Sequence, residues 1–115
     1  MLKAIKQLST FTFAVLLTVI GFFIWRKFTV VQQQLTYREV ISYFVKNRPS
    51  LASKGVLLKK TDFGGAFLIS QNFLDNKDEI LMKSNGVPYG RDFRVTSLDD
   101  ELHEAFGNKD MIIFT

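Results

Sequence analysis

Cysteine is absent from this 115-residue chain, proline occurs only twice and histidine once. The lack of cysteine excludes a disulfide framework, a thiolate metal site and a cysteine nucleophile within the chain. The one histidine, His103, lies in an acidic segment, where a solvated surface position is expected, and no spacing of Asp or Glu indicates further metal ligands. No phosphate-binding glycine loop or nucleophile motif is present. We therefore expect no catalytic residue, no metal and no cofactor.

Acidic residues are missing from the first 38 positions, since all eleven lie at or after Glu39. Four of the fifteen basic residues flank an apolar run near the start: Lys3, Lys6, Arg26 and Lys27. Residues 28–115 then hold eleven basic and eleven acidic side chains and are formally neutral. A nucleic-acid surface needs a local excess of positive charge. The basic pI therefore belongs to the flanks of the apolar run, and we expect no nucleic-acid partner.

The apolar run itself predicts a membrane anchor. From Gln7 to Trp25 there are nineteen residues without a formal charge. As a helix they would extend about 28 Å, close to the roughly 30 Å of bilayer hydrocarbon. Aromatic residues gather at its end beside Arg26 and Lys27, as in an interfacial belt, and no small-residue cleavage site follows. We predict an uncleaved single-pass anchor over residues 1–27, with the lipid bilayer as a partner.

Orientation of this anchor follows the basic residues beside it. The charges on its two sides are nearly balanced, but a short basic head before an apolar run favours a cytoplasmic N-terminus. The bulk of the chain is then expected on the periplasmic or extracytoplasmic side.

The segment FTFAVLLTVIG, residues 11–21, resembles the start of a type IV pilin or pseudopilin. A basic leader precedes it, and Phe11-Thr12 matches the family's opening. Thr10 stands where the family has Gly, and Val15 stands where it has Glu. The resemblance implies an alternative function, a pilin-like structural protein with a non-standard leader.

Apolar residues at spacings of three and four predict that residues 28–48 form an amphipathic stalk helix. The stripe consists of Phe28, Val31, Leu35, Tyr37, Val40, Ile41, Phe44 and Val45. Thr36 could also cap a new helix, with Glu39 three residues later as a capping-box partner. The helix is expected to end before Pro49. The sequence thus allows either one rod or two helices separated by a kink near 32–36.

Residues 49–115 predict a small α+β domain. Two apolar runs flank Gly64-Gly65 and predict a hairpin with strands at 56–61 and 66–71. Residues 75–85 are ambiguous between a short helix from Asp75 to the Asn85-Gly86 turn and a strand at 79–83 that leads into this turn, and we favour the helix. A strand at 91–96 precedes a helix with Ser97 as N-cap and Gly107 just after its end. Residues 111–114 form a last strand. The expected sheet is mainly antiparallel with one or two short helices.

Four residues are the candidate partner contacts. Tyr89 and Arg91 follow a turn in the NGVPYGR segment and belong to residue types enriched in interface hot spots. Val31 and Leu35 belong to the apolar stripe of the predicted stalk. Together these features predict a membrane-anchored, non-catalytic interaction protein, either an accessory subunit of an inner-membrane complex or an immunity-type protein. Anchored bacteriocin-immunity proteins are similar in general plan. The partner is expected to be another membrane or exported protein.

Overall fold

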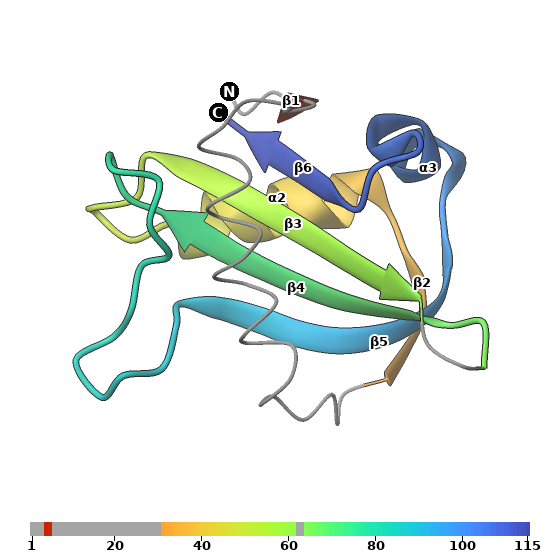
Figure 1. Cartoon of the computed structure of the whole chain (residues 1–115), viewed down its shortest axis with the longest axis horizontal. Helices are drawn as coiled ribbons and strands as arrows, with labels where there is room; N and C mark the ends of the chain where they lie inside the picture. The colour runs from red at the N-terminus through yellow and green to blue at the C-terminus, as the bar shows by residue number, and fades with distance from the viewer. Residues whose placement is uncertain (1–3, 6–30, 62–63) are drawn as a thin grey trace.

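The computed structural model describes residues 4–5, 31–61 and 64–115. They form one mixed sheet with strand order β1-β6-β3-β4-β5-β2, and α2 crosses behind it in the view of Figure 1. The strands are β1 (Ala4–Ile5), β2 (Val31–Leu35), β3 (Lys54–Thr61), β4 (Phe67–Leu74), β5 (Gly90–Leu98) and β6 (Met111–Phe114), and the helices are α2 (Tyr37–Asn47) and α3 (Asp100–Phe106). The α+β class predicted from the sequence is confirmed.

The predicted transmembrane helix, residues 1–27, lies outside the described residues except for the two of β1. Within the described ranges, neither α2 nor α3 is long and apolar enough to cross a bilayer. The anchor therefore stays a prediction from the sequence.

The predicted stalk helix over 28–48 is wrong at Val31–Leu35. Residues Val31–Leu35 form β2, which pairs in parallel with β5 from Val31 opposite Arg94 to Leu35 opposite Leu98. This long-range pairing outweighs the helical preference of the Gln and Leu residues in the Val-Gln-Gln-Gln-Leu segment. The second alternative for Thr36 is confirmed: its hydroxyl accepts the Glu39 N–H at 3.1 Å and caps α2.

Asp99 joins the start of α2 to the start of α3. Its carboxylate accepts the Tyr37 N–H at 3.2 Å and the Leu102 N–H at 3.0 Å, while its own N–H donates to the Leu35 carbonyl at 3.0 Å. Asp99, not Ser97, is therefore the N-cap of α3, because Ser97 is still part of β5. Gly107 ends the helix with a φ of 58°, as predicted.

The hairpin of β3 and β4 is confirmed, with both strands longer than predicted. The predicted helix at 75–85 is wrong. Asp75 uses its carboxylate to accept the N–H groups of Lys77 and Glu79, which closes a tight turn in place of a first helical turn. Two isolated bridges then follow, Leu74 with Ile80 and Met82 with Pro88.

The main core lies between the sheet and its two helices. It includes Val40 and Phe44 from α2 and Leu102 and Phe106 from α3. The alternate residues of β3 and β6 face the other way, and with Leu74 and Ile80 they form a second cluster: Val56, Leu58, Leu74, Ile80, Met111 and Ile113. The sheet is thus apolar on both faces in its β3 and β6 region. We call the face with the second cluster the second face.

Candidate functional site

A rigid hairpin at residues 81–89 projects between β4 and β5. The Leu81 N–H donates to the Phe73 carbonyl at 2.9 Å and the Tyr89 N–H donates to the Leu81 carbonyl at 3.1 Å. At the tip, the Lys83 carbonyl accepts the Gly86 N–H at 3.0 Å and the Lys83 N–H donates to the Val87 carbonyl at 2.7 Å. These bonds fix the backbone before any partner binds, which lowers the entropy lost on binding.

Two apolar side chains stand exposed on this hairpin. Met82 is 40% exposed and Val87 is 50% exposed. The Asn85 side chain accepts the Val87 N–H at 3.1 Å and so holds the turn that presents Val87. The Lys83 ammonium lies 5.8 Å from the centre of the Tyr89 ring.

Lys83 pairs with Val87 and Leu81 with Tyr89, so Val87, Lys83 and Tyr89 share one side of the hairpin. Met82 pairs with Pro88 and lies on the other side. The hairpin therefore presents one exposed apolar side chain on each side, and Val87 shares its side with an aromatic ring and a cation.

Arg91 is stacked between two aromatic rings just beyond the hairpin. Its guanidinium carbon lies 4.3 Å from the centre of the Tyr43 ring and 4.6 Å from that of Phe93. Its Nε donates to Gln71 Oε1 at 2.8 Å, and Gln71 in turn donates to the Val40 carbonyl at 2.9 Å. Strand β4 and helix α2 together therefore hold the Arg91 side chain in place.

Burial shifts the titration of the two stacked groups. Desolvation lowers the pKa of Arg91, and the neighbouring Tyr43 and Glu39 act against that shift. Desolvation raises the pKa of Tyr43, opposed by Arg91 and supported by Asp92. One terminal guanidinium nitrogen, Nη2, is shielded from solvent and has no acceptor in the described part of the chain. Because this nitrogen is shielded, its unmade hydrogen bond is a cost to the fold and not a contact offered to a partner.

The four predicted contacts have different places in the fold. Tyr89 and Arg91 lie together at the base of the hairpin, separated only by Gly90. Val31 is 67% exposed, but it stands on the edge strand β2 opposite Arg94. Leu35 is fully buried in the main core, so its side chain is not available to a partner. A packed core position and a contact surface give the same apolar signal in the sequence.

Other residues of the site were missed by the sequence reasoning. Met82 and Val87 flank the Asn85-Gly86 turn, and that pattern could have indicated a hairpin. Tyr43 and Gln71 gave no signal, because they come from α2 and β4 and meet Arg91 only in the folded chain.

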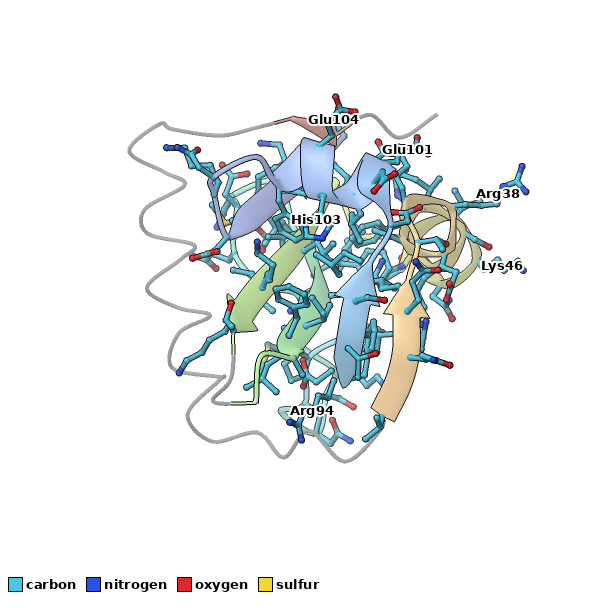
Figure 2. All side chains as sticks on the ribbon, turned by 90° about the vertical axis from the view of Figure 1, so that its right-hand side faces the viewer. Arg38, Lys46, Arg94, Glu101, His103 and Glu104 are labelled. Atoms are coloured by element: carbon cyan, nitrogen blue, oxygen red, sulfur yellow. The ribbon has the colours of Figure 1, made fainter. Side chains whose placement is uncertain are left out.

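No group of three metal-ligating side chains occurs among the described residues. His103 is exposed on α3, and Figure 2 shows it below Glu101 and Glu104, on the side of the helix toward the sheet. Its ring makes an edge contact with Phe67, with a centroid distance of 6.2 Å. His103 therefore has a packing neighbour and no ligand set in this part of the chain.

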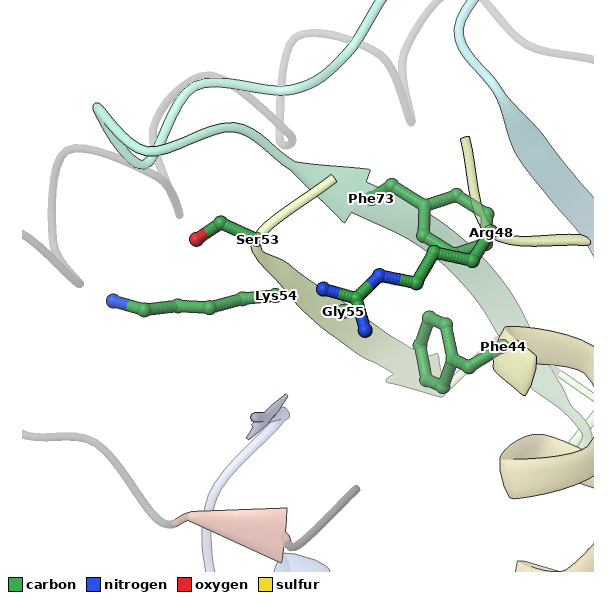
Figure 3. A pocket seen from close by; sticks show the side chains of 6 residues that line it. All are labelled: Phe44, Arg48, Ser53, Lys54, Gly55 and Phe73. Atoms are coloured by element: carbon green, nitrogen blue, oxygen red, sulfur yellow. The ribbon is translucent and has the colours of Figure 1, made fainter. Parts of the chain in front are cut away.

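A pocket between α2, β3 and β4 is lined by Phe44, Arg48, Ser53, Lys54, Gly55 and Phe73, with a volume of about 10 Å³ (Figure 3). Such a volume holds about one water molecule. Arg48 extends across it and donates to the Ala52 carbonyl at 2.9 Å. This pocket is too small for a substrate.

Comparisons with protein-family models, with curated proteins and with solved structures found no match for this chain. The site therefore rests on its own geometry.

The burial of Tyr43 predicts a loss of stability at alkaline pH. Burial favours the neutral phenol, so the folded pKa lies above the ordinary value of 10.0. The neutral phenol stabilises the fold fully when the pH is below the ordinary pKa of tyrosine. This stabilisation is lost as the pH rises through the folded pKa. The free energy of unfolding, measured with urea at about pH 8 and about pH 11, should fall less between these two pH values for Tyr43→Phe than for the wild type. Equal losses would contradict this assignment.

Proposed function

We propose that this chain is a non-catalytic interaction protein that binds another protein through the 81–89 hairpin and Arg91. The observation that carries the proposal is the exposure of Met82 and Val87 on a backbone fixed by its own hydrogen bonds. Exposed apolar side chains on a rigid support, next to Tyr and Arg, have the composition of an interface centre.

The charges around the hairpin indicate the chemistry of the partner. Lys83 shares the Val87 side of the hairpin, and Arg91 adds a second positive charge at its base. A partner surface with an apolar patch bordered by carboxylates would complement both features. We expect rim charges of this kind to speed association more than they strengthen the complex.

Two biological roles are compatible with such a contact: an accessory subunit of a membrane complex and an immunity-type protein. Both require a stable protein–protein interface. The contact residues all lie within 82–91, so the proposal does not depend on whether residues 1–27 form a membrane anchor.

Replacing Val87 with Asp should abolish partner binding. A charge placed at the centre of an apolar contact costs about 2 kcal/mol or more, which weakens binding by about 30-fold or more. Proteins retained by the immobilised full chain are identified by quantitative mass spectrometry, and the affinity of each is then measured with purified components. We expect a protein that the wild type retains and Val87→Asp loses.

Val45→Asp is the matched control. Val45 is 63% exposed on α2, so its substitution adds the same charge on another surface without disturbing the core. The specific partner should bind this variant like the wild type. A partner that binds Val87→Asp unchanged, or is lost from both variants, would contradict the hairpin as the contact site.

A further inference from the structure

Strand β2 forms one edge of the sheet, and in the described part of the chain no strand pairs with its outer side. It is the last strand in the sheet order and the orange strand at the right of the sheet in Figure 2. Its inner side bonds to β5 and the residue after it, since the Leu35 carbonyl accepts the Asp99 N–H at 3.0 Å and the Gln33 carbonyl accepts a hydroxyl from β5. Backbone groups alternate in direction along a strand, so those of Gln32 and Gln34 point outward.

The Gln34 carbonyl supports this outward direction. It accepts the side-chain amide of Gln32 at 2.6 Å, and that amide also donates to the Glu39 carboxylate at 2.8 Å. The Gln32 side chain thus occupies the place at which the N–H of a neighbouring strand would bond. Gln33 and Gln34 are both exposed, so a second strand can reach this edge.

β2 lacks two features that commonly keep an edge strand from pairing. Residues Val31–Leu35 contain no charged side chain and no proline. The edge carries a row of three glutamine side chains instead, and an amide both donates and accepts hydrogen bonds. Two such edges neither repel each other nor leave donors without acceptors.

We propose that β2 pairs with β2 of a second copy of this chain, antiparallel and about a two-fold axis at Gln33. The order Val-Gln-Gln-Gln-Leu has the same pattern of apolar and glutamine residues in both directions. This register places Gln32 opposite Gln34 of the second copy, and these are the two residues whose backbone groups point outward. Each such pair exchanges two backbone hydrogen bonds, so the axis generates four. A two-fold interface needs a self-complementary surface, which this edge provides.

The same register accounts for the exposure of Val31, which is 67%. Val31 lies opposite Leu35 of the second copy, and by the period of two both side chains project on the main-core side of the sheet, away from the second face. Opposite side chains in an antiparallel pair are neighbours, so the dimer covers Val31. This interface is smaller than the standard of about 1,600 Å², so we expect a Kd on the order of 100 µM. The inference does not depend on the hairpin contact.

Cysteine cross-linking of the full chain in mild detergent tests the register, since the native chain contains no cysteine. In Gln33→Cys the two cysteines face each other across the axis, with about 4.5 Å between their Cα atoms, which is within disulfide range. Val31→Cys is the matched control at another exposed position of β2, where the two cysteines are offset by four residues, about 14 Å. On oxidation, we expect the covalent dimer of Gln33→Cys to form at least about tenfold faster than that of Val31→Cys.

Proline substitution tests the backbone hydrogen bonds. Gln34→Pro removes an outward N–H and leaves the bonds to β5 in place, and an edge strand tolerates proline in this position. Gln34→Ala is its control, because it loses the same side chain but keeps the N–H. Sedimentation of the full chain from about 10 µM to about 1 mM should show a dimer for the unsubstituted chain and for Gln34→Ala, and at least about tenfold weaker association for Gln34→Pro.

Equal cross-linking of Gln33→Cys and Val31→Cys, a monomer over the whole concentration range, or an unchanged dimer in Gln34→Pro would overturn the proposal. A different protein that binds the unsubstituted chain and is lost from Gln34→Pro, with no dimer formed, would assign the edge to another occupant and would also overturn it. If Gln34→Pro does not fold, the comparison of the two cysteine variants decides.

Discussion

Replacing Gly90 with Ala should destabilise the fold by about 3–5 kcal/mol, from backbone strain and steric overlap together. Gly90 has a φ of 122°, in the region that side-chain-bearing residues rarely adopt, and it pairs with Asn72 at the start of β5. A Cβ at this position would lie 2.0 Å from the Gln71 carbonyl oxygen and about 3 Å from the Gln71 carbonyl carbon and the Asn72 Cα. Backbone in the middle of a sheet cannot move away without breaking the pairing of β4 with β5.

Gly86→Ala is the control for the backbone conformation alone. Gly86 has a φ of 82° and no atom within 4 Å of the added Cβ. We expect a loss of about 1 kcal/mol for this variant, since only the left-handed conformation is penalised. Urea unfolding of both variants at neutral pH measures the difference. Equal losses in the two variants would show that the close approach of Gly90 to Gln71 carries no stability cost.

The position of Gly90 also connects stability to the proposed site. Gly90 lies between Tyr89 and Arg91, and Gln71, whose carbonyl it approaches, holds the Arg91 side chain through its own amide. Close approach of the two strands therefore aligns the Arg91 donor with Gln71. A variant in which β5 is shifted would lose the pairing of β4 with β5, and Arg91 would no longer be aligned with Gln71.

The elements that could be predicted from the sequence are those whose signals are local. The β3–β4 hairpin was indicated by two apolar runs around Gly64-Gly65, and the end of α3 was indicated by Gly107. Residues Val31–Leu35 could not be assigned in this way, because their extended form depends on pairing with β5, more than 60 positions later. The apolar spacing continued into α2 and suggested a single helix.

The candidate site was predictable to a similar extent. Composition alone pointed to Tyr89 and Arg91, and a turn at Asn85-Gly86 was visible in the sequence. The stack on Tyr43 and the bond to Gln71 depend on where α2 and β4 place these side chains. Leu35 was predicted as a partner contact but is buried, because the sequence does not distinguish an apolar residue of the core from one on the surface. Its complete burial became known only from the fold.

Truncating Phe44 to Ala should cost about 3–5 kcal/mol, because Phe44 is the aromatic centre of the main core. Its ring is 1% exposed, meets Phe73 edge-on at 5.4 Å between centroids and lies 5.1 Å from Phe114. It also rests on Gly55, where a Cβ would lie only 2.5 Å from the ring. Removing the ring leaves a cavity between α2 and three neighbours in the sheet, which the rigid strands cannot close.

Val45→Ala tests whether the loss comes from the core and not from the helix. Val45 is the next residue of α2 but is 63% exposed, so its truncation should change stability by about 0.5 kcal/mol or less. Thermal unfolding should therefore place Phe44→Ala more than about 10 °C below both the wild type and Val45→Ala. Similar midpoints for the two variants would mean that α2 does not pack on the sheet through Phe44.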